Sequence, residues 1–180
     1  MQDAAACGLR GRGLEPGERV ALVLRDSPQF IAAFLGAVKI GAIPVPLSTL
    51  ALAEELAFMQ RDSGAAMTVT DADVDLFIDR REPVVAARTS GDDMSFWQYS
   101  SGTTGRPKAV VHLHGPSVAP ADLHGALVVE MRPEDRVFSV AKLFFSYGLG
   151  ASLLIPFRHG ASSILLPGRP EPRVVFEIAM

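Results

Sequence analysis

The residues best suited to chemistry lie in one short polar segment, residues 100–108, which reads SSGTTGRPK. Its glycines let the backbone come close to a ligand, so that amide N–H groups converge on it, and its hydroxyls add further donors. Lys108 supplies a positive charge, and donors beside a cation suit a polyphosphate. A polar hairpin turn is the alternative, because serine, threonine and glycine are ordinary turn residues.

The spacing of this segment disfavours a P-loop kinase or GTPase. In a P-loop, lysine and then serine or threonine directly follow the last glycine. Here Arg106 and Pro107 separate Gly105 from Lys108. Arg106 either contributes to anion binding or is simply solvated.

A second candidate is the segment 141–150, which reads AKLFFSYGLG. A planar aryl acid needs flat apolar walls and open space beside them, which aromatic rings and glycines provide. The rings and glycines of this segment are Phe144, Phe145, Tyr147, Gly148 and Gly150. Core packing of a Phe pair before a helix is the alternative.

Other polar groups are weaker candidates. His112 and His114 supply two imidazoles without a third ligand, which makes a poor zinc site, so we expect structural or solvated histidines. An acidic run between residues 71 and 79 lacks the glycine and terminal glutamate of an EF-hand and is interpreted as solvated surface.

The composition is that of a globular chain: 180 residues, 48% apolar, with a formal charge of -3. Because the chain has no excess of basic residues, its charge does not favour a nucleic-acid partner. The lone Cys7 forms no internal disulfide, which favours a reducing, cytoplasmic location. The longest stretch without charge or histidine, residues 143–157, is too short to span a membrane, so no membrane partner is expected. The oligomeric state is left open.

The elements that must position these residues alternate between short apolar runs and amphipathic helices, which predicts an α/β fold with a largely parallel sheet. The clearest helix has Ser27 as its N-cap, Pro28 in its first turn and Gly41 after its end. Strands are expected at 19–24, 65–70, 84–87, 94–99, 109–112, 136–140 and 162–166, a proline-spaced edge or crossover segment at 42–47, and helices at 27–40, 52–62, 117–131 and 147–157. Residues 19–70 thus have a β-α-β-α-β order, and residues 71–93 form a surface connection.

The string YSSGTTGRPKAVVH at residues 99–112 resembles the phosphate-binding signature of the adenylate-forming superfamily, which includes acyl-CoA synthetases, luciferases and peptide-synthetase adenylation domains. That family usually has glycine where this chain has Ala109, which we expect to reduce loop freedom and slow turnover without loss of the fold. Residues 17–42 and 141–150 resemble an early segment and the acyl-pocket motif of the same family. The combination is most similar to the benzoate-CoA ligase group.

The resemblance implies that residues 1–180 form a partial AMP-binding N-terminal domain, without the family's C-terminal domain. Residues 1–93 would hold the first βαβ subdomain and a shortened connection, and residues 94–180 the phosphate loop and acyl pocket. The residues that would wrap the ATP phosphates are Ser100, Ser101, Gly102, Thr103, Thr104, Gly105 and the catalytic Lys108. Phe145 would occupy the aromatic gate position, with Tyr147 and Gly148 lining the pocket for the aryl carboxylate.

The implied reaction uses ATP, Mg²⁺ and coenzyme A to convert a small aryl carboxylic acid, through an acyl-adenylate, into its thioester. Benzoate or a substituted benzoate is favoured, and a fatty, cinnamic or amino acid is the fallback. No metal ligand is assigned in this chain, because the family's magnesium carboxylate and terminal lysine lie downstream of such a segment. We therefore expect the 180 residues alone to be inactive. A non-catalytic remnant or nucleotide-binding module is the alternative, and the coding DNA beyond Met180 discriminates between the two.

Overall fold

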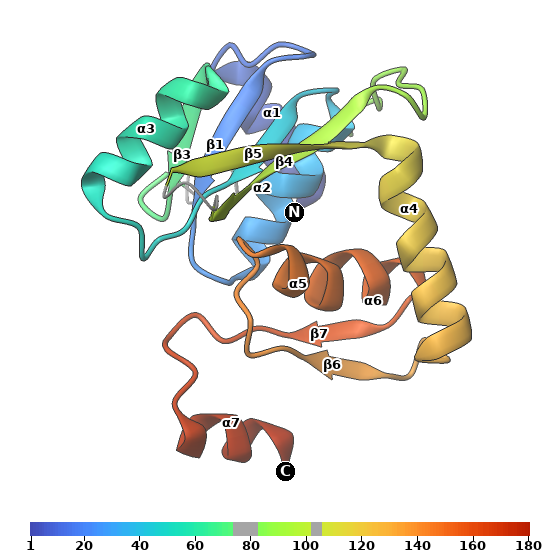
Figure 1. The fold of residues 1–180 in the computed structure, drawn as a ribbon. Coiled ribbons are helices and arrows are strands. Elements are labelled where there is room, and N and C mark those ends of the chain that lie inside the picture. The colour runs from blue at the N-terminus through green and yellow to red at the C-terminus, as the bar shows by residue number, and fades with distance from the viewer. Residues whose placement is uncertain (74–82, 102–105) are drawn as a thin grey trace.

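The computed structural model describes residues 1–73, 83–101 and 106–180, which form three small β-sheets with helices packed against them (Figure 1). The first sheet is parallel, with β1 at its centre. Its strands in spatial order are β2 (Ile43–Pro46), β1 (Arg19–Val23) and β3 (Met67–Thr70). The helices connecting them are α2 (Pro28–Lys39) and α3 (Ala53–Ser63). The predicted α/β class and the β-α-β-α-β order are confirmed.

Helix α2 begins and ends where the sequence predicts. The Ser27 hydroxyl accepts a hydrogen bond from the Phe30 amide at 3.1 Å, which satisfies one of the free donors of the first turn. Gly41, just after the helix, has a φ of 78°, which glycine adopts without strain. The proline-spaced strand β2 lies at an edge of its sheet, as expected for a strand with two missing donors.

Helix α1 (Gln2–Gly11) is absent from the elements expected above. Its buried face consists mostly of alanine and glycine, which give little hydrophobic periodicity to detect. Small residues are needed because α1 and α2 approach closely: a Cβ atom on Gly36 would lie 2.9 Å from the Ala6 amide nitrogen.

The second sheet is an antiparallel hairpin of β4 (Met94–Ser101) and β5 (Pro107–Leu113), packed beside β2. Both strands were expected around the polar segment, and their antiparallel pairing makes that segment the hairpin connection. An aromatic contact ties the hairpin to α2, since the ring centroids of Phe34 and Phe96 are 5.5 Å apart.

The third sheet pairs β6 (Arg136–Phe138) with β7 (Ser162–Ile164) in parallel. The chain between them contains a continuous helical stretch over residues 146–158, as predicted for residues 147–157. Its parts are α5 (Ser146–Leu149), the π-helical segment η3 (Gly150–Leu154) and α6 (Ile155–Arg158).

Two other predictions need correction, and one further helix was not predicted. The helix expected at 117–131 starts earlier, as α4 (His114–Leu123), and continues as the π-helical segment η2 (His124–Val128). The strand expected at 84–87 is wrong: the Ala87 amide donates to the Lys39 carbonyl at 2.8 Å, so this backbone bonds to the end of α2 rather than to a sheet. Helix α7 (Pro172–Ala179) was not expected.

One hydrophobic core joins the early and late parts of the chain. Leu22 and Phe34 from the first part cluster with Leu143, Leu149 and Leu153 from the second, and each is at most 2% exposed. The segment that follows β6 therefore shares one core with β1 and α2, and the Leu143 amide donates to Asp26 in the connection between them.

Candidate functional site

The polar segment 100–108 lies at the closed end of the β4–β5 hairpin. In the antiparallel ladder Ser100 pairs with Lys108, and Ser101 pairs with Pro107. The strand ladder thus holds both ends of the connection at fixed separation. Ser100 and Lys108 are exposed there. Four of the expected phosphate-binding residues, Gly102, Thr103, Thr104 and Gly105, lie outside the described residues.

Tyr99 attaches this end of the hairpin to helix α3. Its hydroxyl donates to an Asp62 carboxylate oxygen at 2.7 Å and lies 3.2 Å from the Met59 carbonyl oxygen. Burial, together with the nearby Asp62 charge, holds the pKa of Tyr99 well above its ordinary value, so the phenol stays protonated and able to donate. On the same face Trp97 is half-buried, with the Arg19 guanidinium carbon 5.8 Å from its ring centroid.

Lys108 differs from the other lysines of the chain. The sequence has three, and Lys39 and Lys142 form ion pairs with Asp3 and Asp26. Within the described residues Lys108 has no ion-pair partner, and its side chain is exposed beside the polar connection. An uncompensated ammonium at this point is the kind of charge an anionic ligand would neutralise.

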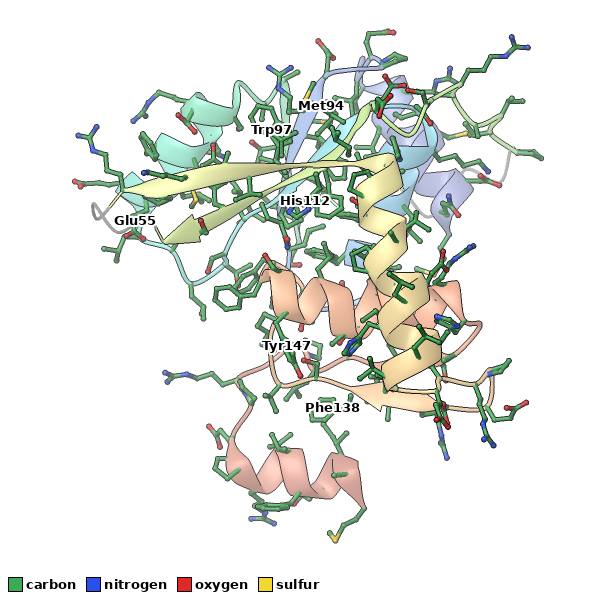
Figure 2. The ribbon with its side chains drawn as sticks, turned by 45° about the vertical axis from the view of Figure 1, so that its right-hand side comes forward. Glu55, Met94, Trp97, His112, Phe138 and Tyr147 are labelled. Carbon is green, nitrogen blue, oxygen red and sulfur yellow. The ribbon has the colours of Figure 1, made fainter. Side chains whose placement is uncertain are left out.

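Arg106 is exposed and lies beside an aromatic ring of α3. Its guanidinium carbon lies 6.0 Å from the centroid of the Phe58 ring of α3. Arg106 and Phe58 line a cleft of about 620 Å³ with Glu54, Glu55, Ala57, Arg61 and Pro107. Figure 2 shows Glu55 at this end of the hairpin. The cleft therefore mixes both signs of charge next to the polar connection.

The second candidate segment divides its aromatic residues between the core and the surface. Leu143 and Phe144 are buried, whereas Phe145 is 52% exposed and Tyr147 is 74% exposed. The rings of Phe144 and Phe145 are 4.6 Å apart and tilted by 59°. In Figure 2 Tyr147 lies on α5, below the hairpin. Of the expected pocket rings, Phe145 and Tyr147 are thus free to contact a ligand.

Gly148 is buried, and the structure gives it a packing role. A Cβ atom there would lie under 3.0 Å from the backbone carbonyl oxygens of Ala141 and Lys142, closer than real Cβ atoms approach. The space left by this glycine is filled by backbone. Gly150 differs, because a Cβ atom at that position would have nothing within 4 Å.

Asp26, which follows β1, was not identified as a candidate residue from the sequence. It contacts the second candidate segment. It is 4% exposed, and its carboxylate accepts a hydrogen bond from the Leu143 amide at 3.0 Å. The Lys142 ammonium is 3.8 Å from its other oxygen. Burial raises the pKa of the Asp26 carboxyl, and the Leu143 amide and Lys142 oppose that rise. A lysine inside the otherwise apolar string AKLFF was the available signal, although it could not name its partner.

Gln98 is a buried polar residue of β4, only 3% exposed, whose amide nitrogen has no hydrogen-bond partner among the described residues. An unsatisfied buried donor lowers stability. We expect Gln98→Leu to raise the free energy of unfolding by about 1 kcal/mol, measured by urea denaturation. The matched control is Gln60→Leu, because the Gln60 amide donates to the Thr68 hydroxyl at 3.0 Å. Equal effects of both substitutions would contradict the prediction.

His112 has structural surroundings. The His112 ring stacks on Phe96 with centroids 4.3 Å apart, and burial lowers the pKa of His112, which favours the neutral imidazole. In the described ranges no three His, Cys, Asp or Glu side chains gather where they could hold a metal ion. No helix described in the structure has both the length and the apolar composition needed to cross a membrane.

Comparisons with known proteins cover nearly the whole chain. A family model described as AMP-binding enzyme matches residues 1–85 and 71–179. The benzoate–CoA ligase of Thauera aromatica is 36% identical over 194 residues, covering 92% of this chain and 37% of its own length.

Two solved structures share the fold. A benzoate CoA ligase from Burkholderia xenovorans LB400 matches with a TM-score of 0.88 and 31% identity, over 98% of this chain and 41% of that protein. The anthranilate CoA ligase AuaEII, in complex with anthranoyl-AMP, matches with a TM-score of 0.89 and 30% identity, over 98% of this chain and 39% of that protein. The chain thus spans about two fifths of the length of these relatives.

Proposed function

The chain belongs to the AMP-binding enzyme family, and on that premise we propose that it forms the ATP- and acid-binding part of a ligase that joins an aryl carboxylic acid to coenzyme A. The observation that carries this proposal is the 36% identity to a benzoate–CoA ligase across 92% of the chain. The chain is homologous to acid–CoA ligases, which are adenylate-forming enzymes.

The proposed reaction has two steps. A carboxylate oxygen of the acid attacks the α-phosphorus of ATP, so that the bond to pyrophosphate breaks and an acyl-adenylate forms. The thiolate of coenzyme A then attacks the acyl carbon, and AMP leaves. The first step brings two anions together, and its barrier falls when fixed cations and N–H donors stabilise the phosphate charge.

Residues of the hairpin are proposed to hold the phosphates. Ser100 and Lys108 are exposed and occupy paired positions in the ladder. The Ser100 hydroxyl and the Lys108 ammonium therefore lie close to the two ends of the same connection. Ser101, Gly102, Thr103, Thr104 and Gly105 are proposed to supply the remaining hydroxyls and amides. Lys108 is the proposed catalytic cation, since it has no carboxylate of its own to neutralise among the described residues.

The exposed rings of Phe145 and Tyr147 are the proposed walls of the acid pocket, supported by their exposure beside a buried, packed turn. Gly148 is proposed to contribute indirectly, because its missing Cβ lets the turn pack closely. Magnesium would accompany ATP in such a reaction, and the described residues gather no carboxylate cluster to hold it. No step is assigned to this metal in the chain.

The acid class is tested by thermal shift of the purified chain with ATP and one acid at a time: benzoate, 3-hydroxybenzoate or a long-chain fatty acid. We expect the aryl acids to raise the melting temperature, because two exposed rings favour a planar apolar partner. Stabilisation by the fatty acid alone would contradict the aryl assignment.

The same preparation tests how much of the reaction these residues perform. The chain spans 37% of the benzoate–CoA ligase it matches, so we expect benzoate-dependent ATP–pyrophosphate exchange to stay at background for the 180 residues alone. Robust exchange would contradict this expectation.

A nucleotide-binding module without catalysis is the second candidate function. Binding of ATP without any response to an aryl acid would favour it.

A further inference from the structure

A buried carboxylate holds one side of the turn that precedes the exposed rings. Asp26 lies in the connection between β1 and α2, and is separated from Leu143 by 117 positions in the sequence. Its bond from the Leu143 amide is fully buried. Buried charges are rarely kept unless they are paired or hydrogen-bonded, and here both conditions are met.

The Lys142 ammonium holds the other side of the same turn. It donates to the carbonyl oxygens of Leu166 and Gly168, just after β7, the second of these at 2.5 Å. It also lies 3.8 Å from Asp26. The turn is therefore fixed to two segments remote in sequence, the end of β1 and the end of β7.

The turn itself decides which side chains are buried. The Phe145 amide donates to the Lys142 carbonyl at 2.9 Å, and the Phe145 carbonyl accepts from the Leu149 amide at 2.8 Å as α5 begins. Leu143 and Phe144 consequently enter the core, while Phe145 remains on the surface. A rotation of this turn would exchange buried and exposed rings.

We propose that Asp26 and Lys142 are positioning residues for the aryl-acid site, acting through the turn 142–145 to fix the exposed faces of Phe145 and Tyr147. This inference rests on the proposed function. Neither side chain needs to touch the acid, since Asp26 is buried and the ammonium of Lys142 is committed to Asp26 and two carbonyls.

The first arm of the test needs no ligand. Hydrogen exchange of individual amides is measured by NMR in the wild-type chain, Asp26→Ala and Lys142→Met. We expect exchange at the Leu143 and Phe145 amides to accelerate about tenfold or more, because each variant removes one attachment of the turn. The internal control is the Leu47 amide, bonded to the Leu22 carbonyl in the first sheet, which should change far less.

Matched variants distinguish the loss of these attachments from a general loss of stability. Asp26→Asn keeps an acceptor of the same shape, and Lys142→Arg keeps the charge and donors. Both are expected to exchange more slowly at Leu143 and Phe145 than their disruptive counterparts. Equal acceleration at all three amides, or none at all, would overturn the inference. If Lys142→Met does not fold, the Asp26→Ala and Asp26→Asn pair decides the outcome.

The second arm uses benzoate and ATP, titrated separately by NMR. We expect Asp26→Ala to weaken benzoate binding about tenfold while ATP binding changes less than about twofold, since the turn carries rings and not the phosphate loop. A folding defect alone would weaken both. If the wild-type chain binds no aryl acid, both the proposed function and the positioning role of Asp26 and Lys142 are overturned. Wild-type binding that Asp26→Ala leaves unchanged would overturn the positioning role alone.

Discussion

Gly148→Ala is expected to lower the free energy of unfolding by about 3 kcal/mol or to prevent folding altogether. The new methyl group would meet the carbonyl oxygens of Ala141 and Lys142 at under 3.0 Å, and backbone oxygen cannot move aside as a flexible side chain does. Since folded domains are stable by only about 5 to 15 kcal/mol, such a loss is a large share of the total. Urea denaturation of the purified chain measures it.

Gly150→Ala is the matched control, because it adds the same methyl group two residues further along. Nothing lies within 4 Å of a Cβ atom at Gly150, which belongs to the helical segment η3. Alanine favours helix over glycine by about 1 kcal/mol, so stability should hold or rise. If both variants lost the same free energy of unfolding, the effect of Gly148→Ala would come from reduced chain flexibility and not from the carbonyl contact.

Lys108→Met is expected to weaken ATP binding about tenfold to a hundredfold, the cost of one charge-assisted contact to phosphate. Methionine keeps much of the side-chain bulk and removes only the ammonium. Because Lys108 is exposed and makes no ion pair in the described part of the chain, stability should stay nearly unchanged. Isothermal titration with ATP at fixed ionic strength measures the effect.

Two controls make the Lys108 result specific. Arg173→Met removes an exposed cation of α7, whose partner is Glu177, and should leave ATP binding unchanged. ATP should also protect Lys108 from acetylation in a mass-spectrometric footprint. Unaltered ATP affinity in Lys108→Met would remove Lys108 from the proposed phosphate site.

Local signals in the sequence were sufficient for much of the fold. The Ser27 cap, the residues that end α2 and the prolines of β2 each act within a few positions, and each appears where it was expected. The strands on either side of the polar segment 100–108 were likewise expected, and they are paired.

Features that depend on distant partners could not be predicted in this way. The small buried face of α1 has meaning only against Gly36 of α2. Gly148 resembled an opening for a ligand, whereas the backbone carbonyl of Lys142 occupies the space where its Cβ atom would lie. Asp26 and Lys142 lie far apart in the sequence and meet only in the folded chain, and no periodicity links them.

Trp97 gives the chain a built-in optical probe. It is the only tryptophan in the sequence, so all indole emission comes from one site on β4, three residues before Ser100. The ring is half-buried beside the Arg19 guanidinium, an arrangement in which small shifts of the strand alter both polarity and quenching. We therefore expect the ligand binding proposed at the hairpin end to change the intrinsic fluorescence, which reports on it in real time without labels and without catalytic turnover.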